Sequence, residues 1–210
     1  MKSFTLEAQD ISKAYSEGKQ VLKEINFTLK NREIIGITGE NGSGKSTLMK
    51  IIADTLEPDS GKMILSLNGN SINGNEYKKH FGFVGPYLKL YDEFNPIELI
   101  KIVTRFRNVF YDEKYAEELF RQFDIHRRRF QPVKTFSSGM KQRMKYVLAL
   151  IHNPEILLLD EPSANLDKGG IETVGNLIEN RISLGGSVII ATNESREAEL
   201  CNSVINLSEI

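Results

Sequence analysis

The chain has 210 residues, and its 27 Lys and Arg against 28 Asp and Glu give a formal charge of −1. This length favours one substantial domain, and the balanced charge excludes a global field that would gather nucleic acid or anionic membrane. The single cysteine, Cys201, excludes an internal disulfide, and no apolar run approaches the roughly 20 residues needed to cross a bilayer. We therefore expect a cytoplasmic protein without a membrane span of its own.

The first thirty residues predict an antiparallel β piece. Residues 4–9 and 24–29 are strand-like, and only a turn-rich segment at 16–18 separates them. The later Asn and Gly cluster at 68–75 is typical of a simple turn.

The rest of the chain alternates between strand and helix patterns. Short β-branched runs at 33–38 and 187–192 alternate with helical patterns at 45–54, 138–151 and 168–182. This alternation predicts a mainly parallel sheet covered by helices, an α/β fold.

Between these elements, residues 95–124 carry a helical pattern rich in charge and aromatics, flanked by Pro96 and Pro132. We interpret this stretch as a helical insertion.

A glycine-rich motif lies where the strand at 33–38 passes into a helix. It reads G-x-x-x-x-G-K-[ST], and its candidate binding residues are Gly39, Asn41, Gly42, Ser43, Gly44, Lys45, Ser46 and Thr47. Glycines let the backbone N–H groups curl around an anion, and the following helix adds the positive end of its dipole. Lys45 would reach the β- and γ-phosphates of a nucleotide, and Ser46 would ligate Mg²⁺. The alternative is a glycine-rich turn with a surface lysine.

A second candidate site ends the apolar run at 156–159. Asp160 and Glu161 follow this run, so they lie at the carboxyl edge of the sheet, where α/β proteins bind ligands. Asp160 suits the Mg²⁺ shell, and Glu161 suits a base that orients and deprotonates an attacking water. A helix cap or a solvated turn is the alternative.

The segment at 136–143 carries a motif specific enough to suggest a family. It reads Phe-Ser-Ser-Gly-Met-Lys-Gln-Arg ahead of a helix and resembles the signature of ABC ATPases, usually written LSGGQ. The resemblance implies that Ser137, Ser138 and Gly139 face the γ-phosphate held by an opposite subunit, in a head-to-tail dimer. An ordinary serine N-cap would give the same letters.

Two more segments match this family. Residues 163–167 resemble the D-loop that meets its counterpart across the dimer, although Asp167 also suits a helix cap. Tyr15 resembles the aromatic residue that stacks on adenine, with a packed or exposed tyrosine as the alternative. The matches run in family order along almost the whole chain.

The resemblance implies a P-loop NTPase of the ABC ATPase type. Residues 1–210 would form one such domain, with an N-terminal antiparallel β subdomain and a helical subdomain at about 87–152. It would bind ATP and Mg²⁺, dimerise with itself or with a related chain, and act on a separate transmembrane permease from the cytoplasmic face of the membrane. Nucleic acid is not expected as a partner.

Two positions depart from the family pattern. The family's Q-loop glutamine is replaced by Pro86, which has neither a side-chain amide nor a backbone donor. Asn193 stands where a switch histidine is expected, since His80, His126 and His152 all lie earlier. Asn193 can donate a hydrogen bond to a γ-phosphate oxygen but cannot shuttle a proton, so we expect slow hydrolysis.

Three functions fit this sequence. The first is a transporter motor, in which ATP closes the dimer and hydrolysis reopens it. The second is a soluble ABC ATPase acting on ribosomes or DNA, which a single cassette of near-neutral charge does not favour. The third is a regulatory module that holds ATP without turning it over, suggested by Pro86 and Asn193.

Overall fold

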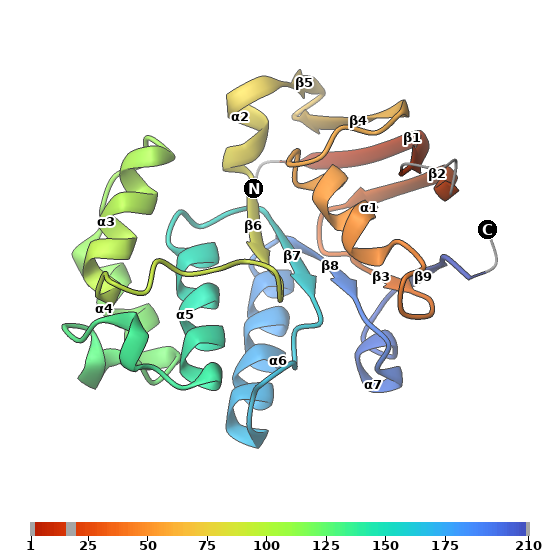
Figure 1. Ribbon diagram of the computed structural model, residues 1–210. Helices are drawn as coiled ribbons and strands as arrows, with labels where there is room; N and C mark the ends of the chain where they lie inside the picture. Colours follow the sequence, from red (N-terminus) through yellow and green to blue (C-terminus); the bar gives the residue numbers. More distant parts are fainter. Residues whose placement is uncertain (1–2, 16–19, 209–210) are drawn as a thin grey trace.

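Two β-sheets form the frame of the computed structural model, which describes residues 3–15 and 20–208 (Figure 1). The first sheet is antiparallel, with strand order β2-β1-β4-β5. Its strands are β1 (Phe4–Ala14), β2 (Gln20–Lys30), β4 (Ser60–Leu67) and β5 (Asn70–Ile72). Alternate residues of β1 are buried on one face, as expected for a strand with one solvated side. The prediction of an N-terminal antiparallel β piece is confirmed, while the turn predicted at 16–18 falls outside the described residues.

The second sheet is parallel, in the order β6-β7-β8-β3-β9. Its strands are β3 (Ile34–Thr38), β6 (Phe81–Val84), β7 (Ile156–Asp160), β8 (Ser187–Ala191) and β9 (Ser203–Asn206). Every residue of β7 and β8 is buried, because helices or the first sheet cover both faces. Their carboxyl ends, and that of β3, lie along one edge, where the predicted site residues follow.

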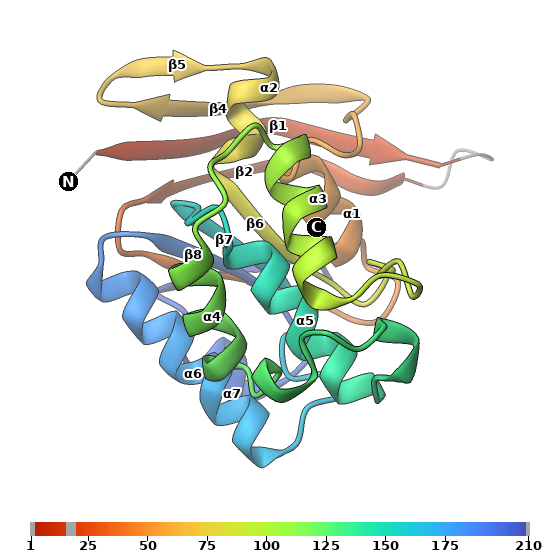
Figure 2. The same cartoon turned by 90° about the vertical axis from the view of Figure 1, so that its left-hand side faces the viewer.

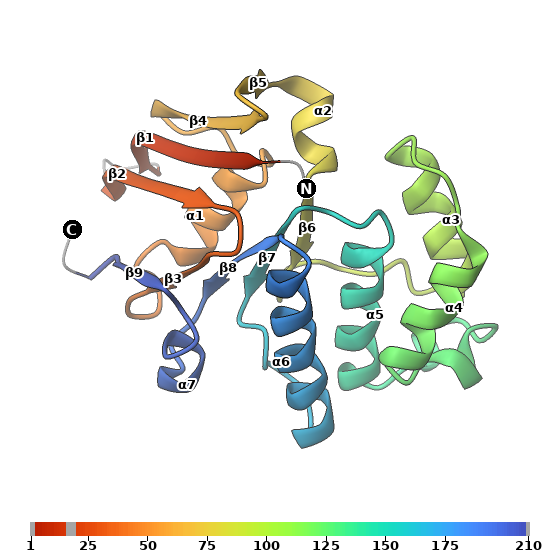
Figure 3. The ribbon, with the colours of Figure 1, turned by 180° about the vertical axis from the view of Figure 1, so that it is seen from behind.

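Helices occupy both sides of the parallel sheet. The helix α1 (Lys45–Ile52) lies between the two sheets, and Figure 2 shows the antiparallel sheet as an outer layer above it. On the other side, α5 (Ser138–Leu150) and α6 (Lys168–Ser183) stand next to each other (Figure 3). Farther out lie α3 (Pro96–Phe106) and α4 (Glu113–Gln122).

The remaining helical pieces are short. They are α2 (Gly74–Lys79), α7 (Ser195–Ala198), and the 3-10 turns η1 (His126–Arg128) and η2 (Val133–Thr135). Among the residues that the structure describes, no helix has both the length and the apolar character to span a membrane.

Alternate residues of the parallel strands belong to two hydrophobic cores, one on each face of the sheet. Leu158 and Ile189 pack on the side of α1 and the antiparallel sheet, whereas Leu159 and Ile190 pack on the side of α5 and α6. Because successive side chains of a strand point to opposite faces, the parallel sheet is packed against a hydrophobic core on each face.

The interpretation of residues 68–75 as a simple turn is wrong. Only Asn68 and Gly69, both with positive φ, form the tight link between β4 and β5. Asn-Gly is the sequence that a two-residue type I′ hairpin prefers. The next residues pair as β5, and α2 begins at Gly74.

Candidate functional site

The phosphate loop joins β3 to α1 in a conformation that requires glycine at two positions. Gly39 has φ +143°, and a Cβ there would lie 2.6 Å from Ser43 Oγ. Gly44 has φ +106°, and its Cβ would lie 2.7 Å from Val21 Cγ1. Both positions lie outside the range that L side chains prefer. The loop is therefore a shaped cradle and not an ordinary turn.

Lys45 is the first residue of α1 and is only 6% exposed. Its Nζ donates to the carbonyl oxygens of Gly39 at 2.6 Å and Glu40 at 3.0 Å. The ammonium is thus held at the loop itself, so the alternative of a surface lysine does not describe it.

Ser46 and Asp160 come together although 114 residues separate them. Ser46 Oγ donates to Asp160 Oδ2 at 2.6 Å, and Asp160 is 1% exposed. Burial raises the pKa of Asp160, and the neighbouring Glu161 adds to this, while the hydrogen bond from Ser46 and the charges of Lys45 and Lys50 oppose it. The pair offers two oxygen atoms beside the phosphate loop.

Glu161 turns away from the buried strand that precedes it. Its φ is +52°, a left-handed conformation unusual for glutamate. Its backbone N–H donates to the carbonyl of Ala191 at 2.9 Å, which ties this turn to β8. The carboxylate is exposed and lines a cavity of about 390 Å³ together with Lys45, Ser46 and Thr47.

Tyr15 lies at another wall of this cavity. It is 47% exposed, and its hydroxyl lies 3.2 Å from Thr47 Oγ1, so the ring stands beside the first turn of α1. The structure therefore brings Tyr15, the phosphate loop and Glu161 to one cavity, and Asp160 is joined to this cavity through its hydrogen bond with Ser46.

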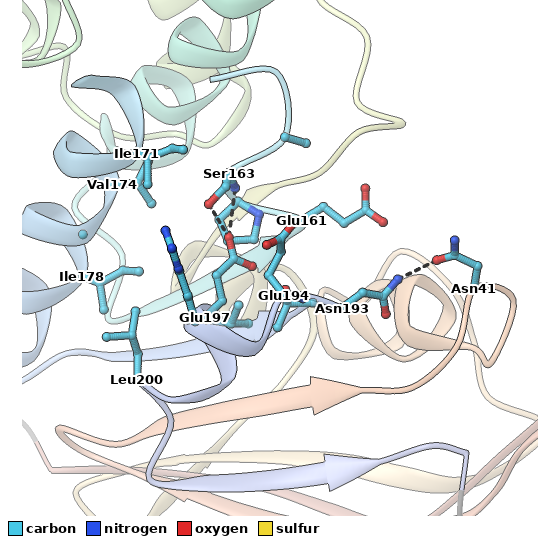
Figure 4. Close-up of a pocket in the computed structure, with 16 residues that line it drawn as sticks. Asn41, Glu161, Ser163, Ile171, Val174, Ile178, Asn193, Glu194, Glu197 and Leu200 are labelled. Carbon is cyan, nitrogen blue, oxygen red and sulfur yellow. Dashed lines mark hydrogen bonds between the residues drawn. The ribbon is translucent and has the colours of Figure 1, made fainter. Parts of the chain in front are cut away.

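Asn193 follows β8 and reaches the same site. Its Nδ2 donates to Asn41 Oδ1 at 2.6 Å, as Figure 4 shows. Its amide therefore touches the phosphate loop directly, and the predicted contact with a γ-phosphate stays a prediction.

The loop that contains Pro86 is held by residues that the motifs did not reveal. Lys145 Nζ, on α5, donates to the carbonyl of Gly85 at 3.0 Å and lies 3.4 Å from that of Pro86. Lys50 Nζ lies 4.2 Å from the centre of the Tyr87 ring. The Tyr87 hydroxyl is buried without a hydrogen-bond partner in the described part of the chain, and burial and the charge of Asp160 raise its pKa.

The signature segment starts α5 as predicted. Ser137 is the N-cap, and its Oγ accepts from the N–H of Met140 at 3.2 Å. Ser137 and Ser138 are exposed, and within the described ranges no hydrogen bond joins Ser137, Ser138 or Gly139 to the phosphate loop. The N-cap reading is confirmed, and it leaves the end of the helix free to face another molecule.

The segment after Glu161 is tied to three helices, α5, α6 and α7. Asp167 caps α6 by accepting from Gly170 N at 2.9 Å, and it pairs with Arg143 of α5 at 2.8 Å. Ser163 donates from both its backbone N–H and its hydroxyl to the carboxylate of Glu197 on α7. No spacing in the sequence signals the bond to Glu197, which is 34 residues away.

Together these features define a class of protein. A parallel sheet carries a phosphate loop at the end of β3 and an acidic pair at the end of β7, and the loop's serine bonds to the first acid. This is the arrangement of a P-loop nucleotide-binding protein.

The chain belongs to the ABC transporter family, whose model, described as "ABC transporter", matches residues 22–164. It is 30% identical to the lantibiotic transport ATP-binding protein SrtF of Streptococcus pyogenes, covering 92% of this chain and 82% of that protein. It is 34% identical to the lipoprotein-releasing system ATP-binding protein LolD of Desulfotalea psychrophila, covering 82% of each chain.

A solved structure described as an ATP binding subunit of an ABC transporter superposes with a TM-score of 0.83 at 28% identity, covering 96% of this chain and 85% of the other. The fold of the ABC ATPase type is thereby confirmed. The chain spans between 45% and 65% of the length of four other curated relatives.

Proposed function

We propose that this chain binds and hydrolyses ATP to drive an ABC transporter. The observation that carries the proposal is the convergence of Lys45, Ser46 and Glu161 on one cavity, with Asp160 bonded to Ser46 behind it. The family assignment and the similarity to ATP-binding subunits support it.

The residues of the cavity fit ATP. The glycine cradle and the α1 N-terminus present N–H donors and a positive dipole end to phosphate oxygens. Lys45 adds a positive charge, which would move from the carbonyls of Gly39 and Glu40 to the phosphates. Tyr15 would stack on the base with its half-exposed ring.

The same site fits Mg²⁺. Ser46 and Asp160 supply hard oxygen atoms, and Mg²⁺ characteristically takes one or two protein ligands and completes its shell with water and phosphate. The bound ion would neutralise charge on the transferring phosphoryl group.

Glu161 is the proposed catalytic base. Its exposed carboxylate borders the cavity that holds Lys45, so it can orient a water towards the γ-phosphate and accept the proton that the water loses. Asn193 would donate a hydrogen bond to a γ-phosphate oxygen by exchanging its present partner, Asn41.

Phosphate release from purified protein tests the proposal. We expect Glu161→Gln to lower turnover by about 100-fold or more while ATP still binds, since general-base catalysis contributes at least that factor. Glu40→Gln is the matched control and should retain activity, because it keeps the backbone of the phosphate loop and removes only an exposed carboxylate of that loop. Equal phosphate release by the wild type and Glu161→Gln would instead support a regulatory module that holds ATP without turning it over, the function suggested by Pro86 and Asn193.

Dimerisation is part of the same proposal. Within the described residues, the N-terminus of α5, with Ser137, Ser138 and Gly139, makes no hydrogen bond to its own phosphate loop, and it suits the γ-phosphate of a second subunit. A homodimer and a heterodimer fit equally. A rise in molecular mass on adding MgATP to Glu161→Gln, measured by light scattering, would support the homodimer.

A transmembrane permease is the proposed partner at the cytoplasmic face of the membrane. The helical subdomain at about 87–152 offers exposed aromatic residues, including Tyr91 at 71% and Phe106 at 88% exposure. Both line a cavity of about 320 Å³ beside α3, and exposed apolar patches of this kind mark interaction sites. Co-purification from a detergent extract tests this, with Phe106→Ser expected to lose the permease.

A further inference from the structure

A second cavity, of about 500 Å³, borders the nucleotide site and shares Asn41 and Glu161 with its lining (Figure 4). It lies between α6, α7 and the segment that follows β7. This volume is within the range of small-molecule sites.

One wall of the cavity is apolar. Ile171, Val174 and Ile178 lie on one face of α6, and Leu200 stands opposite them just after α7. Ile171 is 45% exposed and Leu200 is 48% exposed. Hydrocarbon on a ligand would remove this apolar surface from water, which is favourable.

The lining of the cavity includes the carboxylate of Glu197, of which one oxygen accepts hydrogen bonds and the other does not in the described residues. Glu197 is 8% exposed, and its Oε1 accepts from the N–H of Ser163 at 3.2 Å and from the Ser163 hydroxyl. Its Oε2 is buried and has no hydrogen-bond partner in the part of the chain that the structure describes. A buried acceptor left without a donor is costly, so a donor entering the cavity would bind there.

The charge of the lining selects the kind of donor. Among the described residues that line the cavity, three carry a carboxylate (Glu161, Glu194 and Glu197) and one carries a positive charge (Arg196). A positively charged donor gains both the charge-assisted hydrogen bond and the surrounding negative field.

We propose that this cavity binds a small organic ammonium ion with an apolar body. The N–H group donates to Glu197 Oε2, and the hydrocarbon packs against Ile171 and Leu200. Because the other oxygen of Glu197 holds Ser163, two residues beyond Glu161, the ligand is connected to the segment that carries the proposed catalytic base. The binding itself does not depend on that proposed role.

Ligand-observed NMR titration of the full chain tests this with two probes of nearly equal shape. These are 2-phenylethylammonium and the neutral 2-phenylethanol. We expect the ammonium ion to bind about 10-fold more tightly, because both probes can donate a hydrogen bond to the carboxylate but only the ammonium ion also carries a charge opposite to that of the lining. Equal affinity for the two probes would overturn the proposal.

Variants locate the site. Glu197→Gln should weaken binding of the ammonium ion by about 10-fold and that of the alcohol much less, because only the ammonium ion loses an ion pair. Glu199→Gln, an exposed glutamate at the end of the same helix, is the matched control and should bind as the wild type does. Leu200→Trp, at the exposed rim, should block both probes without disturbing the core.

Unchanged ammonium binding in Glu197→Gln or in Leu200→Trp would contradict the assignment. If neither probe binds, and Glu197→Gln instead weakens ATP-dependent dimerisation, the cavity receives a side chain of a second copy and the small-ligand proposal fails.

Discussion

The phosphate loop and the two loops that face it are held in different ways. Lys45 and Asp160 are almost fully buried, and hydrogen bonds fix Lys45 to the loop carbonyls and Ser46 to Asp160. By contrast, Asn193 is exposed and is held by one amide–amide bond, and Pro86, although Lys145 fixes its loop, has no polar side chain. The groups that would grip ATP are therefore preorganised, whereas the two positions expected to sense its γ-phosphate offer one weakly held amide and no polar side chain, which predicts firm binding with slow turnover.

The largest effect on binding is expected on the preorganised side. Lys45→Met removes the buried ammonium, and we expect ATP affinity to fall by about 10- to 100-fold, the range of a hydrogen bond to a charged group. Equilibrium ATP binding measures this, with the exposed Lys23→Met as control. An unchanged affinity would show that Lys45 of the phosphate loop does not contribute to ATP binding.

A smaller effect is expected at the wall of the cavity. Tyr15→Ala should weaken ATP binding by about 3- to 10-fold through the lost ring contact, while Tyr15→Phe keeps the ring and should bind nearly as the wild type does. Should Phe be as weak as Ala, the hydroxyl contact with Thr47 would be the feature that matters.

The smallest effect concerns stability without ligand. Because burial raises the pKa of Asp160, ionising this carboxyl costs more in the folded chain than in the unfolded one. As pH rises through the raised pKa, the folded state therefore loses stability relative to a neutral side chain. Asp160→Asn should raise the melting temperature at pH 7 by a few degrees, on the order of 1 kcal/mol.

This difference between Asp160→Asn and the wild type should shrink as the pH falls towards about 4, the ordinary range of an aspartate, because the wild-type carboxyl then takes up its proton. Thermal melts across pH measure it. A variant that melts below the wild type at pH 7 would show that the bond from Ser46 outweighs the cost of burial.

The phosphate-binding side of the site could be predicted from local sequence, whereas the long-range contacts around it could not. The glycines of the loop and the acids after β7 were predictable because their letters encode a backbone shape and a strand end. The bonds of Lys145 to Gly85 and of Ser163 to Glu197 were not, since they join residues 60 and 34 positions apart that only the fold brings together.

The same limit applies to the fold. The parallel sheet and the N-terminal antiparallel piece followed from residue patterns, but the strands β4, β6 and β9 were not predicted. The strand β5 was also missed, because it is only three residues long and begins with Asn70 and Ser71, which are poor strand signals. Its pairing with β4 depends on the turn at Asn68 and Gly69.

A single-turnover comparison of the wild type with Asn193→His tests the central claim, that the chain binds ATP firmly and is slowed by its γ-phosphate sensors. ATP affinity and phosphate release are measured on the same samples with Mg²⁺ present. We expect equal affinity and a phosphate-release rate several-fold higher in the variant, because histidine can carry a charge and shuttle a proton. A rate equal to or below that of the wild type would contradict this account.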